Sequence, residues 1–323
     1  MRKIFLFVIL LCWGIVGFTQ NGVNFEHLSF KEALDKAQAE NKLVFVDCYT
    51  SWCGPCRNMT EHIFPQEKVG DYFNSKFVCV KYDMEKGEGP ELGKRFGVRA
   101  YPTFLVLRTD GTLVHKLVGG RDADGIIRGV EEAFDASKAS GAMEASYQAG
   151  ERGKEFLLKY LKTLIRFYDP LETVVAGELM DQLSDKEKMS KDYWFLFTNQ
   201  NLSPAGSNIE KYLLKNYTYF CKSIGKEEVS KEVEKRYVDR LMRIFKKEEI
   251  MTERQLKALG REIDALKLPN NGDLQSYVKI ARGETKNLTS LVSVCENEFF
   301  KIKALEVPYI HFYDRIMKEG TPE

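Results

Sequence analysis

The sequence lacks the charge pattern that nucleic-acid and anionic-lipid partners require, and the ligand spacing that a zinc site requires. Its 48 Lys and Arg residues balance 47 Asp and Glu residues, so no basic field indicates nucleic acid or anionic lipid as a partner. The four histidines and the five isolated cysteines lack the paired spacing of a zinc site, so we expect no metal. We expect no cofactor, and surface or packing roles for the histidines. These residues are Cys12, Cys48, Cys79, Cys221, Cys295, His27, His62, His115 and His311.

An apolar run long enough to cross a membrane is also missing. The stretch 4–18 has fifteen residues, short of the roughly twenty that a spanning helix needs. It follows two basic residues and ends near the small residues Gly17 and Thr19, which predicts a signal peptide over residues 1–19. An uncleaved anchor is the alternative. We expect a secreted or periplasmic protein with no stable membrane insertion after signal cleavage.

The most specific pattern is Cys53-Gly54-Pro55-Cys56, which follows Trp52 and the apolar run 43–46. Two cysteines with this spacing on the first turn of a helix can close a disulfide ring. Unpaired backbone N–H groups at the helix start also stabilise a thiolate. This chemistry moves disulfides between proteins. A zinc ligand pair and a purely structural disulfide are the alternatives.

The order of expected elements predicts an α/β unit. Ser29 and Glu32 form a capping box for a helix that runs to about Glu40. Asp110-Gly111 predicts a hairpin, and Asp122 caps the helix that follows it. The expected strands are 43–48, 77–82, 103–108 and 112–118, and the other expected helices run from the cysteine motif to 64, over 67–74 and over 91–96.

The chain resembles the thioredoxin family over about residues 25–134. The matching features are Trp52-Cys53-Gly54-Pro55-Cys56, Asp47 six positions before the first cysteine, Tyr101-Pro102-Thr103, and Gly119-Gly120. The segment 61–65 departs from plain thioredoxin and looks more like the thioredoxin-like domains of periplasmic disulfide reductases. The resemblance implies a thioredoxin-like fold and thiol-disulfide oxidoreductase activity.

The resemblance also implies roles for the site residues. Cys53, with an exposed sulfur, is the expected attacking thiolate, and Cys56 resolves the mixed disulfide. The Gly54-Pro55 spacer resembles that of reducing thioredoxins. Asp47, a carboxyl in an apolar strand, is expected to exchange a proton with Cys56. A strand-end aspartate that caps a loop is the alternative for Asp47.

Further residues are expected around the cysteines. Lys81 is expected near Asp47 on the adjacent strand, with a solvated strand-end lysine as the alternative. Pro102 is expected to follow a cis peptide bond, which leaves the backbone of Tyr101 to pair with an extended substrate segment. Tyr101 is expected to narrow substrate choice. Trp52 is expected to shield the disulfide, and plain packing is its alternative role.

The remaining cysteines are not expected in the site. Because side chains alternate along a strand, Cys48 and Cys79 are predicted to lie on opposite faces of the sheet as inert core thiols. The sequence leaves open whether Cys221 and Cys295 form a bridge.

The second half is punctuated by amphipathic helical patterns. Ser184 with Glu187, and Thr252 with Gln255, are capping boxes. We expect a thioredoxin-like domain at 20–136, a junction at 137–153, and an all-helical, tetratricopeptide-like domain of unknown function at 154–323.

The favoured hypothesis is an exported enzyme that reduces protein disulfides through Cys53 and Cys56. Its expected partners are a disulfide-bearing protein substrate, an electron-donor protein, and a protein bound by the helical domain. A bacterial cell envelope is favoured, since a glycan at the Asn58 acceptor triplet would crowd Cys56. The alternatives are a non-enzymatic interaction scaffold that uses the helical domain, and an oxidase or isomerase that uses the same cysteines.

Overall fold

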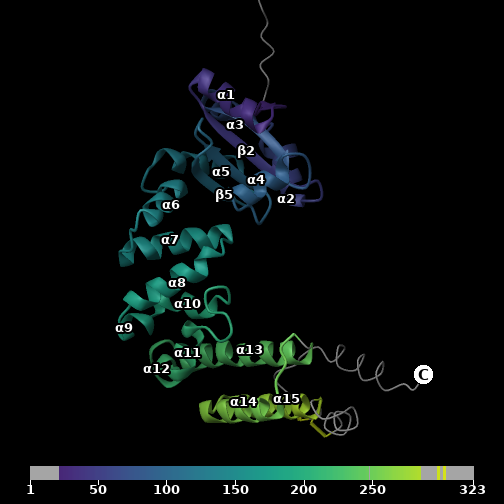
Figure 1. Ribbon diagram of the computed structural model, residues 1–323, viewed down its shortest axis with the longest axis vertical. Coiled ribbons are helices and arrows are strands. Elements are labelled where there is room, and N and C mark those ends of the chain that lie inside the picture. Colours follow the sequence, from purple (N-terminus) through teal and green to yellow (C-terminus); the bar gives the residue numbers. More distant parts are fainter. Residues whose placement is uncertain (1–21, 247, 285–296, 299–300, 303–323) are drawn as a thin grey trace, which may run out of the picture. The chain divides into compact units, whose positions relative to one another are not determined.

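The chain divides into two compact units (Figure 1). The first comprises residues 22–152 and 162–169, and the second comprises 153–161 and the residues from 170 onward. The computed structural model describes residues 22–246, 248–284, 297–298 and 301–302. The predicted signal peptide therefore lies outside the described residues. Cys295 lies outside them as well, so the question whether it forms a bridge with Cys221 stays open.

The first unit is built around a five-stranded mixed sheet in the order β1-β3-β2-β4-β5. Strands β1, β3 and β2 run parallel, whereas β4 runs antiparallel to β2 and to β5. The strands are β1 (Phe25–Glu26), β2 (Leu43–Tyr49), β3 (Phe77–Asp83), β4 (Thr103–Leu107) and β5 (Leu113–Val118). The sequence predicted all of them except β1, because two residues are too short to show an alternating pattern.

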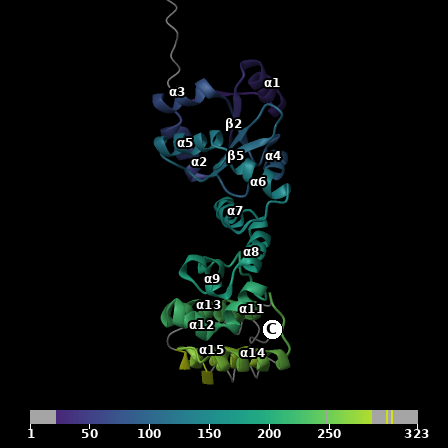
Figure 2. The same cartoon turned by 90° about the vertical axis from the view of Figure 1, so that its left-hand side faces the viewer.

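Helices cover both faces of this sheet, with α2, α3 and α5 on one side and α1 and α4 on the other (Figure 2). The helices are α1 (Phe30–Glu40), α2 (Gly54–Asn58), α3 (Glu67–Lys76), α4 (Gly89–Arg95), α5 (Ala123–Glu131) and α6 (Ser140–Gln148). A π-helix, Met59–Ile63, continues α2, and a 3-10 turn, Glu132–Phe134, continues α5. The predicted helical stretch from the cysteine motif to Phe64 is therefore confirmed.

The predicted helix starts and the hairpin are confirmed by their hydrogen bonds. Ser29 and Glu32 make the full capping box of α1. The Asp122 carboxylate accepts from the Gly125 backbone at 2.7 Å and so caps α5. Gly111 has a φ of 77°, a conformation that a residue without a Cβ adopts readily, and it allows the tight turn between β4 and β5.

Strand β2 is buried on both faces. Phe45 belongs to the core under α2, α3 and α5, whereas Val44 and Val46 belong to the core under α1 and α4. Cys79 lies in the first core and Cys48 in the second, so the prediction that they occupy opposite faces is confirmed. Burial raises the pKa of both thiols, which makes them unreactive.

The second unit is helical, which confirms the predicted class. Helix α7 (Lys154–Phe167) contributes residues to both units. The other helices are α8 (Leu171–Gln182), α9 (Asp185–Lys188), α10 (Phe195–Thr198), α11 (Asn208–Lys215), α12 (Tyr217–Ser223), α13 (Lys226–Phe245), α14 (Glu253–Leu266) and α15 (Asn271–Glu284). The predicted capping boxes begin α9 and α14.

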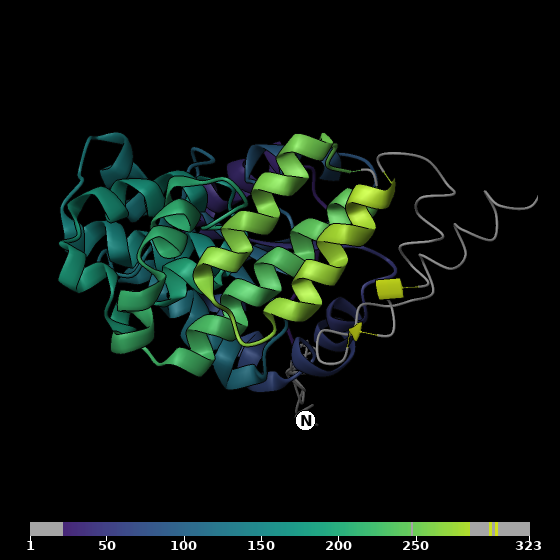
Figure 3. The same ribbon diagram turned by 90° about the horizontal axis from the view of Figure 1, so that it is seen from below.

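Helices α14 and α15 lie side by side, and α15 also packs against α13 (Figure 3). The tetratricopeptide-like repeat stays a prediction. Among the described helices, none is both long and apolar enough to cross a membrane.

Helix α4 allows a test of the packing at the end of β3. A Cβ on Gly89 would lie 1.9 Å from the Asp83 carbonyl oxygen, so we expect Gly89→Ala to lower the free energy of unfolding by roughly 2 kcal/mol or more. On the same helix, a Cβ on Gly93 would make an ordinary contact with Met84. Gly93→Ala should therefore raise stability by roughly 0.5–1 kcal/mol. Urea unfolding of both variants measures the difference, and equal midpoints would contradict this packing.

Candidate active site

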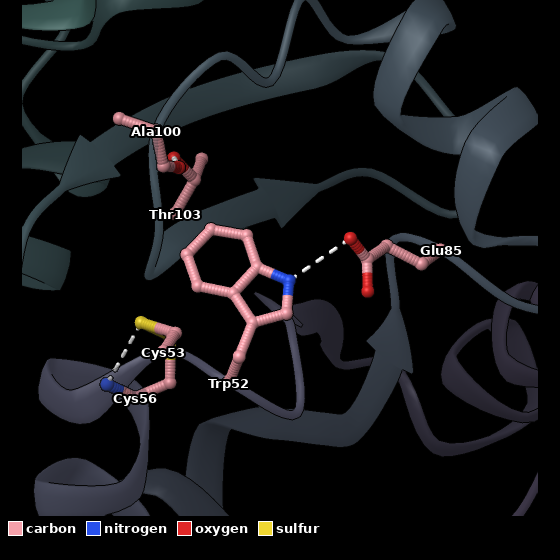
Figure 4. The surroundings of a disulfide bond; sticks show 6 residues. All are labelled: Trp52, Cys53, Cys56, Glu85, Ala100 and Thr103. Carbon is pink, nitrogen blue, oxygen red and sulfur yellow. Dashed lines mark hydrogen bonds between the residues drawn. A yellow bond between two sulfur atoms is a disulfide. The ribbon is translucent and has the colours of Figure 1, made fainter.

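The redox pair lies where strand β2 ends. The chain leaves β2 through a turn in which the Thr50 carbonyl oxygen accepts a hydrogen bond from the Cys53 backbone at 3.2 Å. Cys53 then precedes α2 and forms a disulfide with Cys56, with the two Cα atoms 5.3 Å apart. The Cys56 backbone N–H donates to the Cys53 sulfur at 3.2 Å (Figure 4). This N–H is one of the backbone donors at a helix start that have no partner within the helix itself.

The expected exposure of Cys53 is wrong for this state. Cys53 is 4% exposed and Cys56 is 3% exposed, so solvent access does not distinguish them. In the disulfide the two sulfurs face each other, which withdraws both from solvent. The feature that distinguishes them is the hydrogen bond, because only the Cys53 sulfur accepts from the helix start.

Trp52 lies beside the disulfide and is 64% exposed (Figure 4). Its indole N–H donates to the Glu85 carboxylate at 2.9 Å, and its ring meets Tyr101 edge-on at 5.9 Å between centroids. The indole is therefore held in place although it faces solvent. Sequence reasoning missed Glu85, because an acidic residue in the loop after β3 matches no motif.

Asp47 and Lys81 are neighbours in register on β2 and β3. Asp47 is 1% exposed, and its Oδ1 has no hydrogen-bond partner among the described residues. Burial raises the pKa of the Asp47 carboxyl to about 7, and the positive charge of Lys81 partly opposes this rise. This is a carboxyl inside the sheet, so the alternative of a loop-capping aspartate does not describe it.

The peptide bond between Tyr101 and Pro102 is cis, as the resemblance implied. The Pro102 carbonyl oxygen accepts from Gly119 at 2.8 Å, which joins this loop to the end of β5. A Cβ on Gly120 would lie 3.5 Å from the Pro55 side chain, so the same glycine pair lies against the spacer between the cysteines. Distant parts of the predicted pattern thus meet at one place.

A cavity of about 180 Å³ opens beside the disulfide. Its lining residues are Tyr49, Thr50, Ser51, Cys53, Cys56, Arg57, Thr60 and Lys81. This lining includes two cationic side chains, Arg57 and Lys81, and no carboxylate. Positive charge near a cysteine favours its thiolate, so the cavity suits a reactive sulfur electrostatically. The sequence analysis did not single out Thr50 or Arg57.

Two histidines of the first unit, His115 and His62, differ in burial. His115 on β5 is buried and accepts a hydrogen bond from the Ser140 backbone at 3.2 Å. Burial lowers the pKa of His115 to about 4, so it is neutral near pH 7. His62 is exposed beside Glu61. Across the residues that the structure describes, no group of three or more His, Cys, Asp or Glu side chains could hold a metal ion.

A second cavity of the first unit, about 880 Å³, lies at α4, the β4–β5 hairpin and α6. Its lining includes basic residues, Lys94 and Lys116 among them, and acidic residues, Glu144 and Asp169 among them. Lys116 is buried there, and both carboxylates act on its charge. Because both signs of charge line this cavity, it indicates no ligand class.

The buried carboxyl of Asp47 makes stability depend on pH. The folded protein holds the Asp47 proton up to about pH 7, whereas the unfolded chain releases it near pH 4. Stability contributed by this group therefore falls as pH rises between these values, by about 4 kcal/mol at most. We expect Asp47→Asn to be more stable than the wild type at pH 8 and nearly equal to it at pH 4.

The measurement is the free energy of unfolding by urea at several pH values. Asp71→Asn, on the exposed surface of α3, is the control and should follow the wild type. A difference between Asp47→Asn and the wild type that does not grow with pH would contradict a buried, proton-holding carboxyl.

Comparison with known proteins finds a family model that matches part of the first unit. The thioredoxin family model matches residues 23–132. Thioredoxin H4 of Arabidopsis thaliana is 41% identical over 28% of this chain and 71% of its own length. A protein disulfide-isomerase of Datisca glomerata is 25% identical over 57% of this chain. The chain spans only 36% of that relative's length, so the isomerase similarity is partial.

Among solved structures, a solution structure from Bacteroides thetaiotaomicron described as a disulphide-isomerase is 49% identical, over 36% of this chain and 95% of that one, with a TM-score of 0.34. The family model covers the sheet, the cysteine pair and the cis-proline loop. Since the chain also aligns with most of Thioredoxin H4 at 41% identity, it belongs to the thioredoxin family.

Proposed function

We propose that the protein is an exported thiol-disulfide oxidoreductase that reduces protein disulfides through Cys53 and Cys56. One observation carries the proposal. The two cysteines form a disulfide at the start of a helix, and the Cys56 backbone N–H donates to the Cys53 sulfur. In the reduced protein the same N–H stabilises a thiolate on Cys53, which is the nucleophile of disulfide exchange.

In the first step the Cys53 thiolate attacks one sulfur of a substrate disulfide. The substrate S–S bond breaks, its second sulfur leaves as a thiolate, and Cys53 is joined to the substrate as a mixed disulfide. The cations of Arg57 and Lys81 in the adjoining cavity stabilise the attacking charge.

In the second step Cys56 attacks the Cys53 sulfur and releases the reduced substrate. The Cys56 thiol must first lose its proton, and we assign the acceptor role to Asp47. A carboxyl with a pKa of about 7 can both accept and return a proton near neutral pH. Two electrons pass to the substrate, and the protein is left with the Cys53–Cys56 disulfide.

The loop before β4 is the proposed substrate contact. An extended substrate segment is proposed to pair with the backbone of Tyr101, which precedes the cis-proline Pro102, as an added strand would. Trp52, held by Glu85 and in contact with Tyr101, forms an apolar rim for that segment. The bulk of the Tyr101 ring narrows the choice of substrate.

The proposed setting is the bacterial cell envelope, on the basis of the signal-like pattern at residues 1–19. A dithiol stays reduced outside the cytoplasm only if a donor supplies electrons, so an electron-donor protein is a proposed partner. The helical unit is proposed to recruit a protein partner, and its architecture alone supports this role.

Trapping of substrate tests the activity. We expect Cys56→Ser to accumulate mixed disulfides with envelope proteins, because Cys53 still attacks and nothing resolves the product. Cys53→Ser should trap none. Non-reducing gels followed by mass spectrometry measure the adducts, with Cys221→Ser as the control that changes a half-buried cysteine elsewhere. A Cys56→Ser protein that traps nothing would favour the interaction scaffold.

The direction of electron flow is tested by the reduction potential of the pair. The Gly54-Pro55 spacer favours a reductant, so we expect roughly −250 mV or below. Equilibration with glutathione, followed by alkylation and mass measurement, gives the value. A potential of roughly −120 to −180 mV would instead identify an oxidant or isomerase that uses the same cysteines.

A further inference from the structure

The Thr50 hydroxyl is a buried polar group whose hydrogen-bonding capacity is unused among the described residues. Thr50 is 2% exposed, and its Oγ1 has no hydrogen-bond partner within the described part of the chain. Its backbone carbonyl oxygen, by contrast, accepts a hydrogen bond from Cys53. Burying a hydroxyl without a partner costs free energy, so such a group calls for an explanation.

The geometry places Thr50 close to Cys53, and both residues line one cavity. The hydrogen bond from the Cys53 backbone to Thr50 closes a four-residue turn, whose first and last Cα atoms lie within about 7 Å of each other. Thr50, Cys53 and Cys56 also line the same cavity of about 180 Å³. A disulfide sulfur is a weak, uncharged acceptor, whereas a thiolate accepts charge-assisted hydrogen bonds. The hydroxyl therefore has a suitable acceptor only after reduction.

We propose that the Thr50 hydroxyl donates a hydrogen bond to the Cys53 thiolate of the reduced protein. The proposal rests on the function proposed above. When a dithiol reduces the protein, the Sγ–Sγ bond breaks and the cysteines gain two electrons and two protons. Cys53 then releases its proton to solvent, and its sulfur accepts from both the Thr50 hydroxyl and the Cys56 backbone. Thr50 keeps its own proton throughout and sets the thiolate population.

The neighbouring hydroxyls of the cavity do not fit this role. Ser51 and Thr60 line it as well, but both residues are exposed, so water satisfies their hydroxyls. Thr60 lies in the π-helix Met59–Ile63 and provides a matched control of the same residue type.

The test compares Thr50→Val, which removes the hydroxyl and keeps the shape, with Thr50→Ser, which keeps the hydroxyl. After reduction with dithiothreitol, the rate of Cys53 alkylation by iodoacetamide is measured against pH by peptide mass spectrometry. We expect Thr50→Val to raise the pKa of Cys53 by roughly one unit, which is a tenfold loss of thiolate. Thr50→Ser and Thr60→Val should match the wild type.

A second readout is the thiol-disulfide equilibrium with glutathione. Thr50→Val should shift it toward the disulfide by up to tenfold, about 30 mV. If Thr50→Val matches the wild type, or if Thr50→Ser behaves like Thr50→Val, the proposed hydrogen bond is overturned. Should Thr50→Val fail to fold, Thr50→Ala replaces it. A wild-type Cys53 without a thiolate near neutral pH would overturn the proposed function itself, which keeps the two failures distinct.

Discussion

The central strand β2 carries the constraint on which the first unit depends. Its backbone pairs with β3 on one edge and with β4 on the other, and its side chains alternate between two separate cores. A strand satisfied on both edges and both faces has little freedom to move. The position where it ends is therefore well defined, and the turn that carries Cys53 begins there.

Strand β2 and the residue that follows it carry buried polar groups. Asp47 is buried with an oxygen that lacks a hydrogen bond among the described residues, and Thr50 follows in the same condition. Each would be replaced by an apolar residue if stability alone decided the sequence. Such groups gather at functional sites, where altered proton affinity and unpaired donors serve chemistry. Thr50 lines the cavity beside the Cys53–Cys56 pair, which agrees with the proposed reduction of disulfides.

Much of the fold was predictable because its signals are local. The capping boxes, the Asp110-Gly111 turn and the opposite faces of Cys48 and Cys79 each depend on a few neighbouring residues. The exposed sulfur expected for Cys53 was wrong, because the closed disulfide and its surroundings withdraw it from solvent. Glu85 carries no local signal, since its role depends on the indole of a residue 33 positions away.

The sequence by itself determined the redox pair, the helix caps and the division into an α/β part followed by a helical part. These features depend on spacing within one turn or one strand. Only the tertiary structure decided that Glu85 holds Trp52, and that the Thr50 hydroxyl is buried without a partner among the described residues. Each of these depends on which distant segments meet, and packing in three dimensions, not local preference, determines that.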